Sequence, residues 1–426
     1  MPASDRVIVV GGGVAGLVAA RALALAGRDV ELLERGNRLG GQLASHSVAG
    51  IELDVGPESY AVGGVGGAAL SSLLRSLRLD GDVVHPRAMP AWLHRADGSA
   101  VPLPASNLLG IPGVPLAQDV IDAIGFGAAF RAQLDNLVPG LVAAKARSVG
   151  EVVRRRMGRA VLDGLVAPVV RGTHGVSPDE LDLDLALPGV RGALLRQGSL
   201  AGAVRSRRET ASEEGLVASL RGGLHRIVAA LTGDLERFGV RVRTGVEVTV
   251  ADEHGVTTAA GERIDGEVLV AASLGAPASR TRVTVATVAI DAPELADAPR
   301  GTGVFVAEGA PGVAARALSH LSATWAWIGE ATPLQLLRLT YDGEAEMTPE
   351  RAHHDAEVLL GRTLPAPTDA AIVRWERAGR RADAGHAIDG MRRVGEAESG
   401  TGLATVIPYA LDVVNAIPSD GDGRQD

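Results

Sequence analysis

Three glycines and one acid near the start of the chain have the spacing of a dinucleotide-binding turn. Gly11, Gly13 and Gly16 follow a hydrophobic run at residues 6–10, and Glu34 ends a second such run. The first glycine permits a tight turn, the second lets the backbone approach a diphosphate, and the third lets the next helix pack closely on the strand. A carboxylate at the position of Glu34 can accept hydrogen bonds from a ribose hydroxyl. The pattern therefore predicts that the chain binds a dinucleotide.

The elements that position these residues are predicted from the hydrophobic pattern around them. Residues 7–10 are a continuous β-branched run, which suits a parallel strand covered on both faces. The Ala/Leu-rich residues after Gly16 predict a helix that stops at Gly27, with its N-terminal N–H groups and dipole facing the diphosphate. Residues 29–33 predict the second strand, with Glu34 at its end. The alternative for the motif is a glycine-rich turn without a ligand.

The composition excludes several kinds of chemistry. The 426 residues include no cysteine, so disulfides, thiolate metal sites and cysteine nucleophiles are excluded, and we predict no metal site. Lys145 is the single lysine, and nothing around it suggests a Schiff-base mechanism. A net charge of −9 argues against a nucleic-acid partner. The length and the 46% share of hydrophobic residues are typical of a globular protein with two or three domains.

The sequence also bears on location. The N-terminus lacks the charged start and cleavage site of a signal peptide, and the uncharged stretch at 98–118 contains four prolines, which rules out a regular membrane helix. We therefore expect a cytoplasmic protein and leave peripheral membrane contact open. The basic cluster Arg154, Arg155, Arg156 and Arg159 is interpreted as a solvated helix face. Its alternative roles are guiding an acidic substrate and touching an anionic surface.

The order of patterns along the chain predicts an α/β protein whose dinucleotide-binding domain is discontinuous. A helix is expected at 68–79 and a hairpin at 89–101, followed by a mainly helical stretch from 118. A second helix-and-strand pattern runs from 224 to 271, and strand-like alternation follows it. The expected divisions are a dinucleotide-binding domain at 1–80, 215–281 and 385–426, a substrate domain at 81–117 and 282–384, and a helical lobe at 118–214.

Several segments resemble one family of flavoproteins. Residues 34–41 resemble the second glycine motif of FAD-dependent amine oxidases, phytoene desaturases and protoporphyrinogen oxidases, which NAD dehydrogenases do not normally carry. Nearly the whole chain resembles the bacterial protoporphyrinogen and coproporphyrinogen III oxidases, and residues 172–181 are similar to actinobacterial members. The segments that carry this resemblance are 11–16, 37–42, 56–59, 91–94, 101–104, 220–224 and 400–408.

The resemblance implies an amine-oxidase-like flavoprotein with a discontinuous FAD-binding Rossmann-like domain, a mixed-sheet substrate domain and a helical lobe. It implies FAD-dependent oxidation of a porphyrinogen, with coproporphyrinogen III converted to coproporphyrin III, O2 as acceptor and H2O2 as coproduct, in haem biosynthesis. The flavin N5 would accept the hydride, so no side chain is assigned a catalytic role. A large apolar pocket with a few polar anchors would hold the substrate.

The same resemblance implies a set of binding residues. Those for the cofactor are Gly11, Gly13, Ala15 and Gly16 at the diphosphate, Glu34 at the ribose, Arg35 and Gly41 along the cofactor, Gly56, Pro57, Glu58 and Ser59 at the flavin end, Val248 at the adenine, and Trp375, Gly402, Thr405, Val406 and Ile407 near the isoalloxazine and ribityl chain. Gly172 and Arg338 are the implied substrate-binding residues. In the alternative interpretation, Gly172 ends a helix and Arg338 pairs with a surface acid.

The sequence departs from the family pattern in three places. Gly63-Gly64 stands where related enzymes carry a basic residue, and residues 380–382 replace a Pro-Gln-Tyr sequence. The interval from His386 to Gly400 is shorter than usual by roughly one strand, which would remove a glycine that contacts the flavin. Two other functions therefore remain: a flavin oxidase or desaturase of an amine or polyene, and a homologue that binds flavin or tetrapyrrole without turnover. Lys145 falls in the helical stretch, which argues against an amine oxidase.

Overall fold

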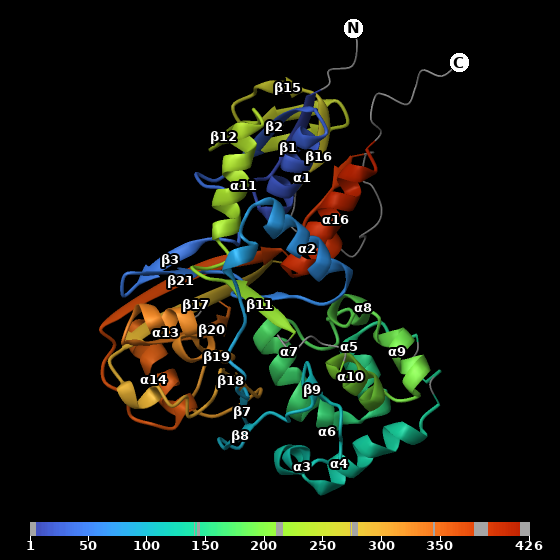
Figure 1. Ribbon diagram of the computed structural model, residues 1–426, viewed down its shortest axis with the longest axis vertical. Coiled ribbons are helices and arrows are strands. Elements are labelled where there is room, and N and C mark those ends of the chain that lie inside the picture. Colours follow the sequence, from blue (N-terminus) through green and yellow to red (C-terminus); the bar gives the residue numbers. More distant parts are fainter. Residues whose placement is uncertain are drawn as a thin grey trace.

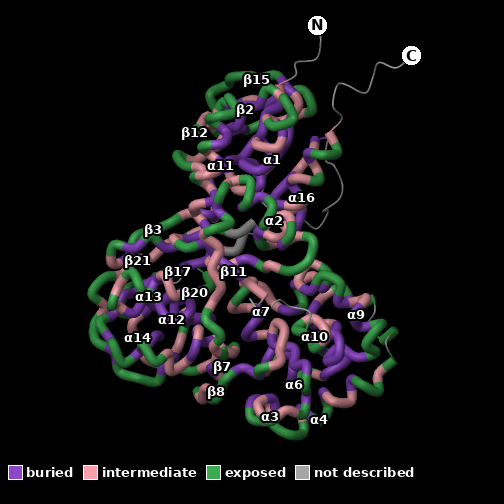
Figure 2. Tube along the Cα trace, viewed as in Figure 1, coloured by how far each residue is buried: buried purple, intermediate pink, exposed green. Residues whose placement is uncertain are grey.

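The computed structural model describes residues 6–139, 141–142, 145–209, 216–272, 274, 280–343, 346–378 and 391–417. Figure 1 shows three regions: a mixed α/β region around β1 and α1, a second sheet with its own helices around β20, and a helical lobe around α7 and α10. Figure 2 shows that each region has its own buried interior. The chain crosses between these regions several times, so each is built from separate stretches of sequence.

A five-stranded parallel sheet forms the core of the first region. Its order is β12-β2-β1-β16-β22, so the strand order reverses between β1 and β16. β1 is buried as its β-branched run predicts, and it pairs with β2 on one side and β16 on the other. Sheets of this kind bind ligands at the carboxyl ends of the strands, where the order reverses. The strands are β1 (Arg6–Val10), β2 (Asp29–Glu34), β12 (Arg241–Thr244), β16 (Glu267–Val270) and β22 (Arg392–Arg393).

Helices cover one face of this sheet, and a small antiparallel sheet covers the other. α1 packs against both α11 and α16, and their aliphatic side chains share one core with β1 and β2. Strands β13, β14 and β15 bury a valine or isoleucine each against the opposite face. The bounds are α1 (Val14–Leu25), α2 (Gly64–Ser76), α11 (Arg226–Arg237), α16 (Leu403–Asn415), β13 (Val248–Asp252), β14 (Gly255–Thr258) and β15 (Arg263–Asp265).

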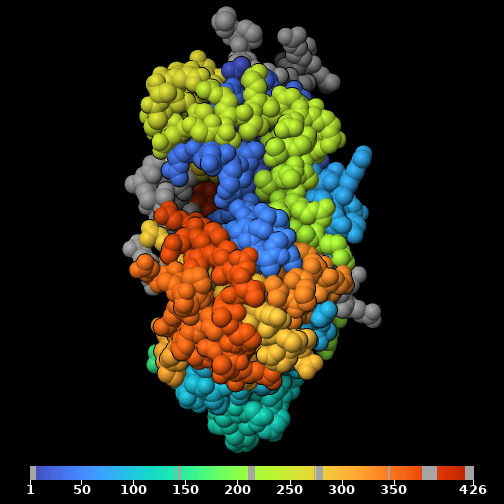
Figure 3. All heavy atoms as spheres, turned by 90° about the vertical axis from the view of Figure 1, so that its left-hand side faces the viewer, coloured from blue at the N-terminus to red at the C-terminus, as the bar shows by residue number. Residues whose placement is uncertain are grey.

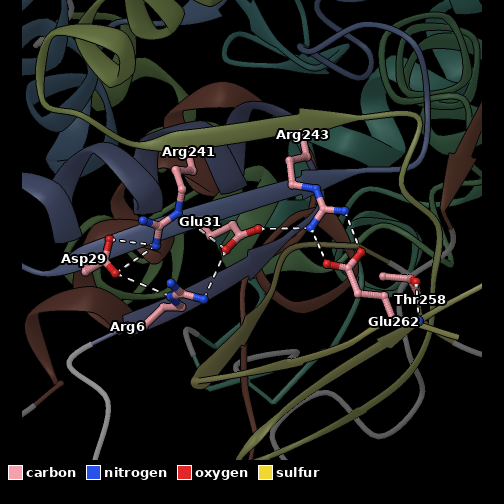
Figure 4. A network of polar contacts seen from close by, with 7 residues as sticks. All are labelled: Arg6, Asp29, Glu31, Arg241, Arg243, Thr258 and Glu262. Atoms are coloured by element: carbon pink, nitrogen blue, oxygen red, sulfur yellow. Dashed lines mark hydrogen bonds and ion pairs between the residues drawn. The ribbon is translucent and has the colours of Figure 1, made fainter. Parts of the chain in front are cut away.

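An ionic network lies toward the amino ends of β1 and β2 (Figure 4). Glu31 is 5% exposed, and its carboxylate lies 3.3–3.6 Å from the guanidinium groups of Arg6, Arg241 and Arg243. Asp29 pairs with Arg241 at 2.8 Å. A hollow of about 710 Å³ opens beside these groups. The charges of this network pair with one another, and the network lies at the opposite end of the strands from Gly11. We therefore infer that it stabilises the sheet.

A seven-stranded sheet forms the second region, in the order β21-β17-β20-β19-β18-β7-β8. One face packs on α14 through Leu337 and Leu339 of β20. Because side chains alternate along a strand, Arg338 points to the opposite face, together with its cross-strand partner Ser319. The bounds are β7 (Trp92–His94), β8 (Ala100–Pro102), β17 (Arg280–Ile290), β18 (Gly303–Val306), β19 (Ala317–His320), β20 (Gln335–Asp342), β21 (Asp369–Ala378), α12 (Leu321–Thr324), α13 (Ala326–Ala331) and α14 (Pro349–Leu360).

The helical lobe contains a buried charge that corrects the sequence interpretation of the basic cluster. Arg156 is 0% exposed and pairs with the equally buried Asp135 at 2.5 Å, so it does not belong to a solvated face. Arg159 is exposed, as expected. The helices are α3 (Gln118–Ile124), α4 (Phe126–Gln133), α5 (Val149–Arg156), α6 (Arg159–Val161), a π-helical turn (Leu162–Val166), α7 (Ala167–His174), α8 (Leu183–Ala186), α9 (Val190–Gln197) and α10 (Leu200–Glu209).

Short strands connect the three regions. The hairpin of β3 and β4 contacts β21 and β17, so this part of the N-terminal segment packs against the seven-stranded sheet. Strand β11 pairs with β5 on one side and β6 on the other, and Figure 1 shows it between the regions. The bounds are β3 (Ser45–Val48), β4 (Ile51–Asp54), β5 (Tyr60–Ala61), β6 (Val83–Val84), β9 (Asn107–Leu108), β10 (Ile111–Pro112), β11 (Val217–Leu220) and α15 (Glu396–Ser399).

Most of the predicted elements are confirmed. β1, α1 and β2 match the predicted strand, helix and strand, and β7 with β8 forms the hairpin expected at 89–101. The helix expected at 68–79 instead spans 64–76 as α2. Its first turn contains several glycines. A Cβ on Gly66 would lie 1.8 Å from the carbonyl oxygen of Ala404, so only glycine allows α2 to lie against α16 there. The residue boundaries of the domains stay a proposal.

The described residues show neither a membrane-spanning helix nor a metal-binding cluster. Within those ranges, none of the helices is both long and apolar enough to cross a membrane. The same residues hold no group of three or more His, Asp or Glu side chains that could bind a metal ion.

Candidate cofactor and substrate site

The carboxyl ends of the parallel strands bring the predicted glycines and acid to one edge of the five-stranded sheet. Gly11 follows β1, Ala271 follows β16, and Glu34 ends β2. Gly11 has φ +111°, and a Cβ there would lie 2.8 Å from the carbonyl oxygen of Ala271. The turn is thus formed where the strand order reverses. This is the edge at which a dinucleotide would bind.

The three glycines of the turn have separate physical roles. A Cβ on Gly16 would lie 1.9 Å from the carbonyl oxygen of Gly11, so Gly16 lets α1 pack closely on β1. A Cβ on Gly13 would meet no described atom within 4 Å, so this position is open. Ala15 is buried on α1. Gly13 therefore has the space that a diphosphate needs to approach the N-terminus of α1.

Glu34 lies against the glycine turn. Its Oε2 accepts a hydrogen bond from the N–H of Gly12 at 2.7 Å, and its Oε1 accepts one from the N–H of Gly36 at 2.6 Å. Each carboxylate oxygen has a further lone pair, so the same group can also accept hydrogen bonds from ribose hydroxyls. The residues present therefore fit the ribose of a dinucleotide.

The second glycine motif packs beside the first. The N–H of Gly40 donates to the carbonyl of Gly12 at 2.8 Å, and a Cβ on Gly41 would lie 3.3 Å from the Cα of Gly13. Gly41 has φ +57°, a conformation that favours glycine. The side chain of Arg35 is 67% exposed and 4.0 Å from Glu247. The structure thus brings Gly41 beside Gly13, the predicted diphosphate position, whereas the side chain of Arg35 points to solvent.

The predicted adenine-side residue lies on the neighbouring small sheet. Val248 is buried at the start of β13, in the core that includes Leu33 of β2. The N–H of Val246 donates to the carbonyl of Glu34 at 2.9 Å, which holds this segment beside the acid. Val248 is therefore near the predicted ribose position, although its side chain packs in a hydrophobic core.

Residues 55–59 connect β4, whose hairpin packs against the seven-stranded sheet, to β5, whose Tyr60 lies in the hydrophobic core of the first region. A Cβ on Gly56 would lie 2.3 Å from the carbonyl oxygen of Gln42, so this segment passes close to the second glycine motif. Pro57, Glu58 and Ser59 follow it and are half-buried. Figure 3 shows a recess on this side of the molecule, between the blue N-terminal segment and the orange strands, with dark red C-terminal residues at its base.

Arg338, predicted to bind substrate, reaches this connecting segment. It is 8% exposed and donates to the carbonyls of Val55 at 3.0 Å and Gly56 at 2.5 Å. Its guanidinium also lies 3.4 Å from the carboxylate of Glu58. The other carboxylate oxygen of Glu58 accepts a hydrogen bond from Ser319 at 2.9 Å. Arg338 therefore contacts two backbone carbonyls and a half-buried acid of its own chain. Its predicted substrate role stays a prediction.

The described end of the interval from His386 to Gly400 contains a short strand. This strand, β22, pairs in parallel with β16 and leads to Gly395 at φ +115°. The shortening of the interval relative to the family stays a prediction. Glu396 accepts a hydrogen bond from the side chain of Gln42 at 2.8 Å. The sequence analysis did not assign Gln42, Gly395 or Glu396 to the site. The Val-Gly-Glu sequence at 394–396 was the available signal for the last two. The departures at 380–382 and at His386 lie outside the described residues.

Helix α16 places the remaining predicted cofactor residues. Gly402 precedes the helix with φ +98°, and a Cβ there would meet no described atom within 4 Å. Thr405 is half-buried in the first turn, whereas Val406 and Ile407 belong to the hydrophobic core shared with α1. Of the four predicted residues here, Gly402 and Thr405 are accessible to a ligand, whereas Val406 and Ile407 are enclosed in the core. The predicted contacts of Val406 and Ile407 stay proposals.

Gly172 and Trp375 lie on separate elements. Gly172 is inside α7, and a Cβ there would lie 2.4 Å from the ring of Phe305. It therefore lets α7 contact β18 and does not end the helix. Trp375 lies on β21 opposite Val283 of β17. The structure does not bring Gly172 into contact with Arg338, and both substrate assignments stay proposals.

One histidine near Arg338 has a shifted pKa. His46 of β3 lies with its Nε2 3.1 Å from the hydroxyl of Thr287, which is fully buried on β17. Burial and the positive charge of Arg338 hold the pKa of His46 below its ordinary value. His46 is therefore neutral near pH 7 and reports on the charge of Arg338.

These features together define an FAD-dependent oxidoreductase: a glycine turn, a ribose-side acid, a second glycine motif, and a substrate sheet joined to the cofactor edge. Comparison with known proteins makes the class specific. The model of the family "Flavin containing amine oxidoreductase" matches residues 14–304, and the chain belongs to that family. FAD is its cofactor.

The chain is also similar to individual proteins. It is 27% identical to a coproporphyrinogen III oxidase of Propionibacterium freudenreichii over 334 residues, 71% of this chain and 62% of that protein. It is 26% identical to a coproporphyrinogen III oxidase of Staphylococcus aureus over 261 residues, 58% of this chain and 54% of that protein. The match thus spans between half and two thirds of the length of these relatives.

Solved structures confirm the fold. A crystal structure from Exiguobacterium sp. 255-15, provisionally named protoporphyrinogen oxidase, superimposes with a TM-score of 0.79 at 23% identity, covering 97% of this chain and 98% of that chain. A putrescine oxidase bound to putrescine gives a TM-score of 0.62 at 15% identity, covering 96% of this chain and 98% of that chain. At these identities the similarity shows the amine-oxidase-like fold alone.

Proposed function

We propose that this protein oxidises a porphyrinogen, with coproporphyrinogen III as substrate, coproporphyrin III and H2O2 as products, and O2 as acceptor, in cytoplasmic haem biosynthesis. The observation that carries the proposal is the similarity, over most of this chain, to two enzymes named coproporphyrinogen III oxidase. The connection of the cofactor edge to the seven-stranded sheet through residues 55–58 supports it, because a flavin enzyme must hold its substrate against the cofactor.

In this proposal the chain mainly binds and orients. Gly13 and the N-terminus of α1 hold the diphosphate, and Glu34 accepts hydrogen bonds from the ribose. Gly56 and the first turn of α16, after Gly402, lie along the flavin end. Bound FAD supplies hydride acceptance, which is the difficult part of the chemistry. The oxidation removes six electrons in three two-electron rounds, and no described side chain is needed as a strong base.

The test uses the purified full chain with FAD. Coproporphyrinogen III added without oxygen should bleach the flavin absorbance, and admitting air should restore it and produce porphyrin fluorescence with three H2O2 per porphyrin. Protoporphyrinogen IX, a primary amine and a polyene serve as alternative substrates. Bleaching by the amine or polyene alone would overturn the proposal, as would FAD binding without bleaching by either porphyrinogen. Faster bleaching by protoporphyrinogen IX would overturn the choice of substrate.

A further inference from the structure

The side chain of Arg338 crosses from the seven-stranded sheet to a backbone segment of the cofactor edge. It lies on β20, in the middle of that sheet, and is 8% exposed. Its terminal nitrogens donate to the carbonyls of Val55 and Gly56, which are themselves buried, and approach Glu58. These partners are 280 to 283 residues away in sequence. Arg338 therefore joins two regions of the molecule by direct contact.

Three of the five N–H donors of the Arg338 guanidinium are committed to Val55, Gly56 and Glu58. One terminal nitrogen bonds both carbonyls, and the other faces Glu58, whose second oxygen accepts the hydroxyl of Ser319. Ser319 is directly opposite Arg338 on the neighbouring strand β19, so adjacent strands hold Glu58 from two positions. A substrate carboxylate that displaced these contacts would leave buried carbonyls unpaired, which is costly.

The contacts continue from Gly56 to the cofactor edge. Gly56 lies so close to Gln42 that a Cβ would be 2.3 Å from its carbonyl oxygen. The side chain of Gln42 donates to Glu396, one residue after the positive-φ Gly395. A shift of the carbonyls of Val55 and Gly56 would therefore move the backbone beside the second glycine motif. The position of that backbone depends on a side chain of the seven-stranded sheet.

We propose that Arg338 is a positioning residue, not a substrate ligand: it fixes the Val55–Gly56 backbone and so couples the seven-stranded sheet to the FAD-binding edge. The inference rests on the proposed function only for its kinetic readout. The measurement of FAD affinity requires only that the chain binds FAD, which its family membership shows. The pKa of His46 can be measured without cofactor or substrate.

The experiment compares Arg338→Met and Arg338→Lys with the matched control Arg316→Met. Arg316 is also buried, at 7% exposed, and pairs with Asp342 away from residues 55–58. Both methionine variants should lose stability, but only Arg338→Met should weaken FAD binding, by about tenfold or more, because buried carbonyls lose their donor. Arg338→Lys should recover part of the affinity, since an ammonium can still donate to them.

The kinetic readout separates positioning from substrate binding. With coproporphyrinogen III, Arg338→Met should lower kcat at saturating FAD and leave KM within about twofold of wild type. The opposite result, a KM raised about tenfold with kcat and FAD affinity unchanged, would identify Arg338 as a substrate ligand and overturn the proposal. An equal loss of FAD affinity in Arg316→Met would overturn it as well, because the effect would then be general destabilisation.

A titration of His46 provides a check that needs neither FAD nor turnover. The pKa of its imidazole, followed by NMR, should rise in Arg338→Met, because a positive charge beside it is lost, and should stay low in Arg338→Lys. An unchanged pKa in Arg338→Met would overturn the placement of the guanidinium beside Thr287 and His46, which its position on β20 requires. If wild-type protein oxidises no porphyrinogen, the proposed function fails, whereas FAD affinity and the His46 titration still decide the role of Arg338.

Discussion

Replacing single glycines of the first turn should separate its ligand-binding role from its packing role. Gly13 has φ −71° and ψ 174°, which alanine adopts without strain, and a Cβ there would meet no described atom within 4 Å. A Cβ on Gly16 would instead lie 1.9 Å from the carbonyl oxygen of Gly11. The two substitutions add the same methyl group, three residues apart, so any difference between them comes from location.

The structure sets the size of each effect. Non-bonded heavy atoms stay about 3.5 Å apart, so Gly16→Ala would push α1 from β1 by roughly 1.5 Å. Overpacking of that kind costs about 1–3 kcal/mol of unfolding free energy. Gly13→Ala should change that free energy by less than about 0.5 kcal/mol. It should raise the Kd for FAD by at least about tenfold, because the methyl group occupies the approach of the diphosphate.

The assay is urea denaturation of the FAD-free chain, followed by FAD titration of each folded variant. Gly127→Ala on α4 is the control, since a Cβ there would also meet no described atom within 4 Å. This variant should raise the free energy of unfolding by about 0.5–1 kcal/mol, because alanine is a better helix former than glycine, and should leave the Kd for FAD unchanged. Wild-type FAD affinity in Gly13→Ala would refute the placement of the diphosphate. Wild-type stability in Gly16→Ala would refute the close packing of α1 on β1.

Two further predictions concern charges. Arg156→Met should lower the free energy of unfolding in urea by about 3–5 kcal/mol, because it leaves the fully buried Asp135 without its ionic partner. Arg159→Met, at an 81% exposed site, should change that free energy by less than about 0.5 kcal/mol. Equal effects of the two substitutions would contradict the buried pair. Hydrogen bonds from Arg263 lower the pKa of Asp252 to about 2, so its stabilising contribution is complete above pH 4 and is lost as the pH falls through 2. Urea midpoints measured from pH 5 to pH 2.5 should therefore fall less steeply in Asp252→Asn than in wild type, and parallel curves would count against the ion pair.

The beginning of the chain could be predicted in detail because its information is local. The glycine spacing, the buried run of β1 and the acid at Glu34 all follow from neighbours in sequence, and the structure places Gly11, Gly16 and Glu34 as those patterns require. The family resemblance identified the fold and FAD for the same reason. A strand as short as β22 has too few residues for a hydrophobic alternation, so the sequence did not predict it.

Buried charges escaped prediction because their partners are distant in sequence. The run of arginines at 154–156 is interpreted from the sequence as a solvated helix face, yet Arg156 donates to carbonyls of residues 135, 138, 139, 142 and 198 and to the carboxylate of Asp135. The helical spacing of Val149, Val152 and Val153 places Arg156, and not Arg155, on the buried face of α5. What the local sequence does not show is the partner, because Asp135 lies 21 residues earlier in the chain.

Arg338 shows the same limit with a consequence for function. The resemblance of its Leu-Leu-Arg strand to the family implies a substrate-binding cation, which stays a prediction, and the structure places its side chain on the face of the sheet opposite α14. What the sequence could not show is that residues 55–58 come within reach and occupy the guanidinium. A carboxylate that competed with Glu58 for Arg338 would break the contact between them, whereas Ser319 could still hold Glu58. The carbonyls of Val55 and Gly56 depend on the same guanidinium, and these backbone contacts are the direct structural basis of the positioning role.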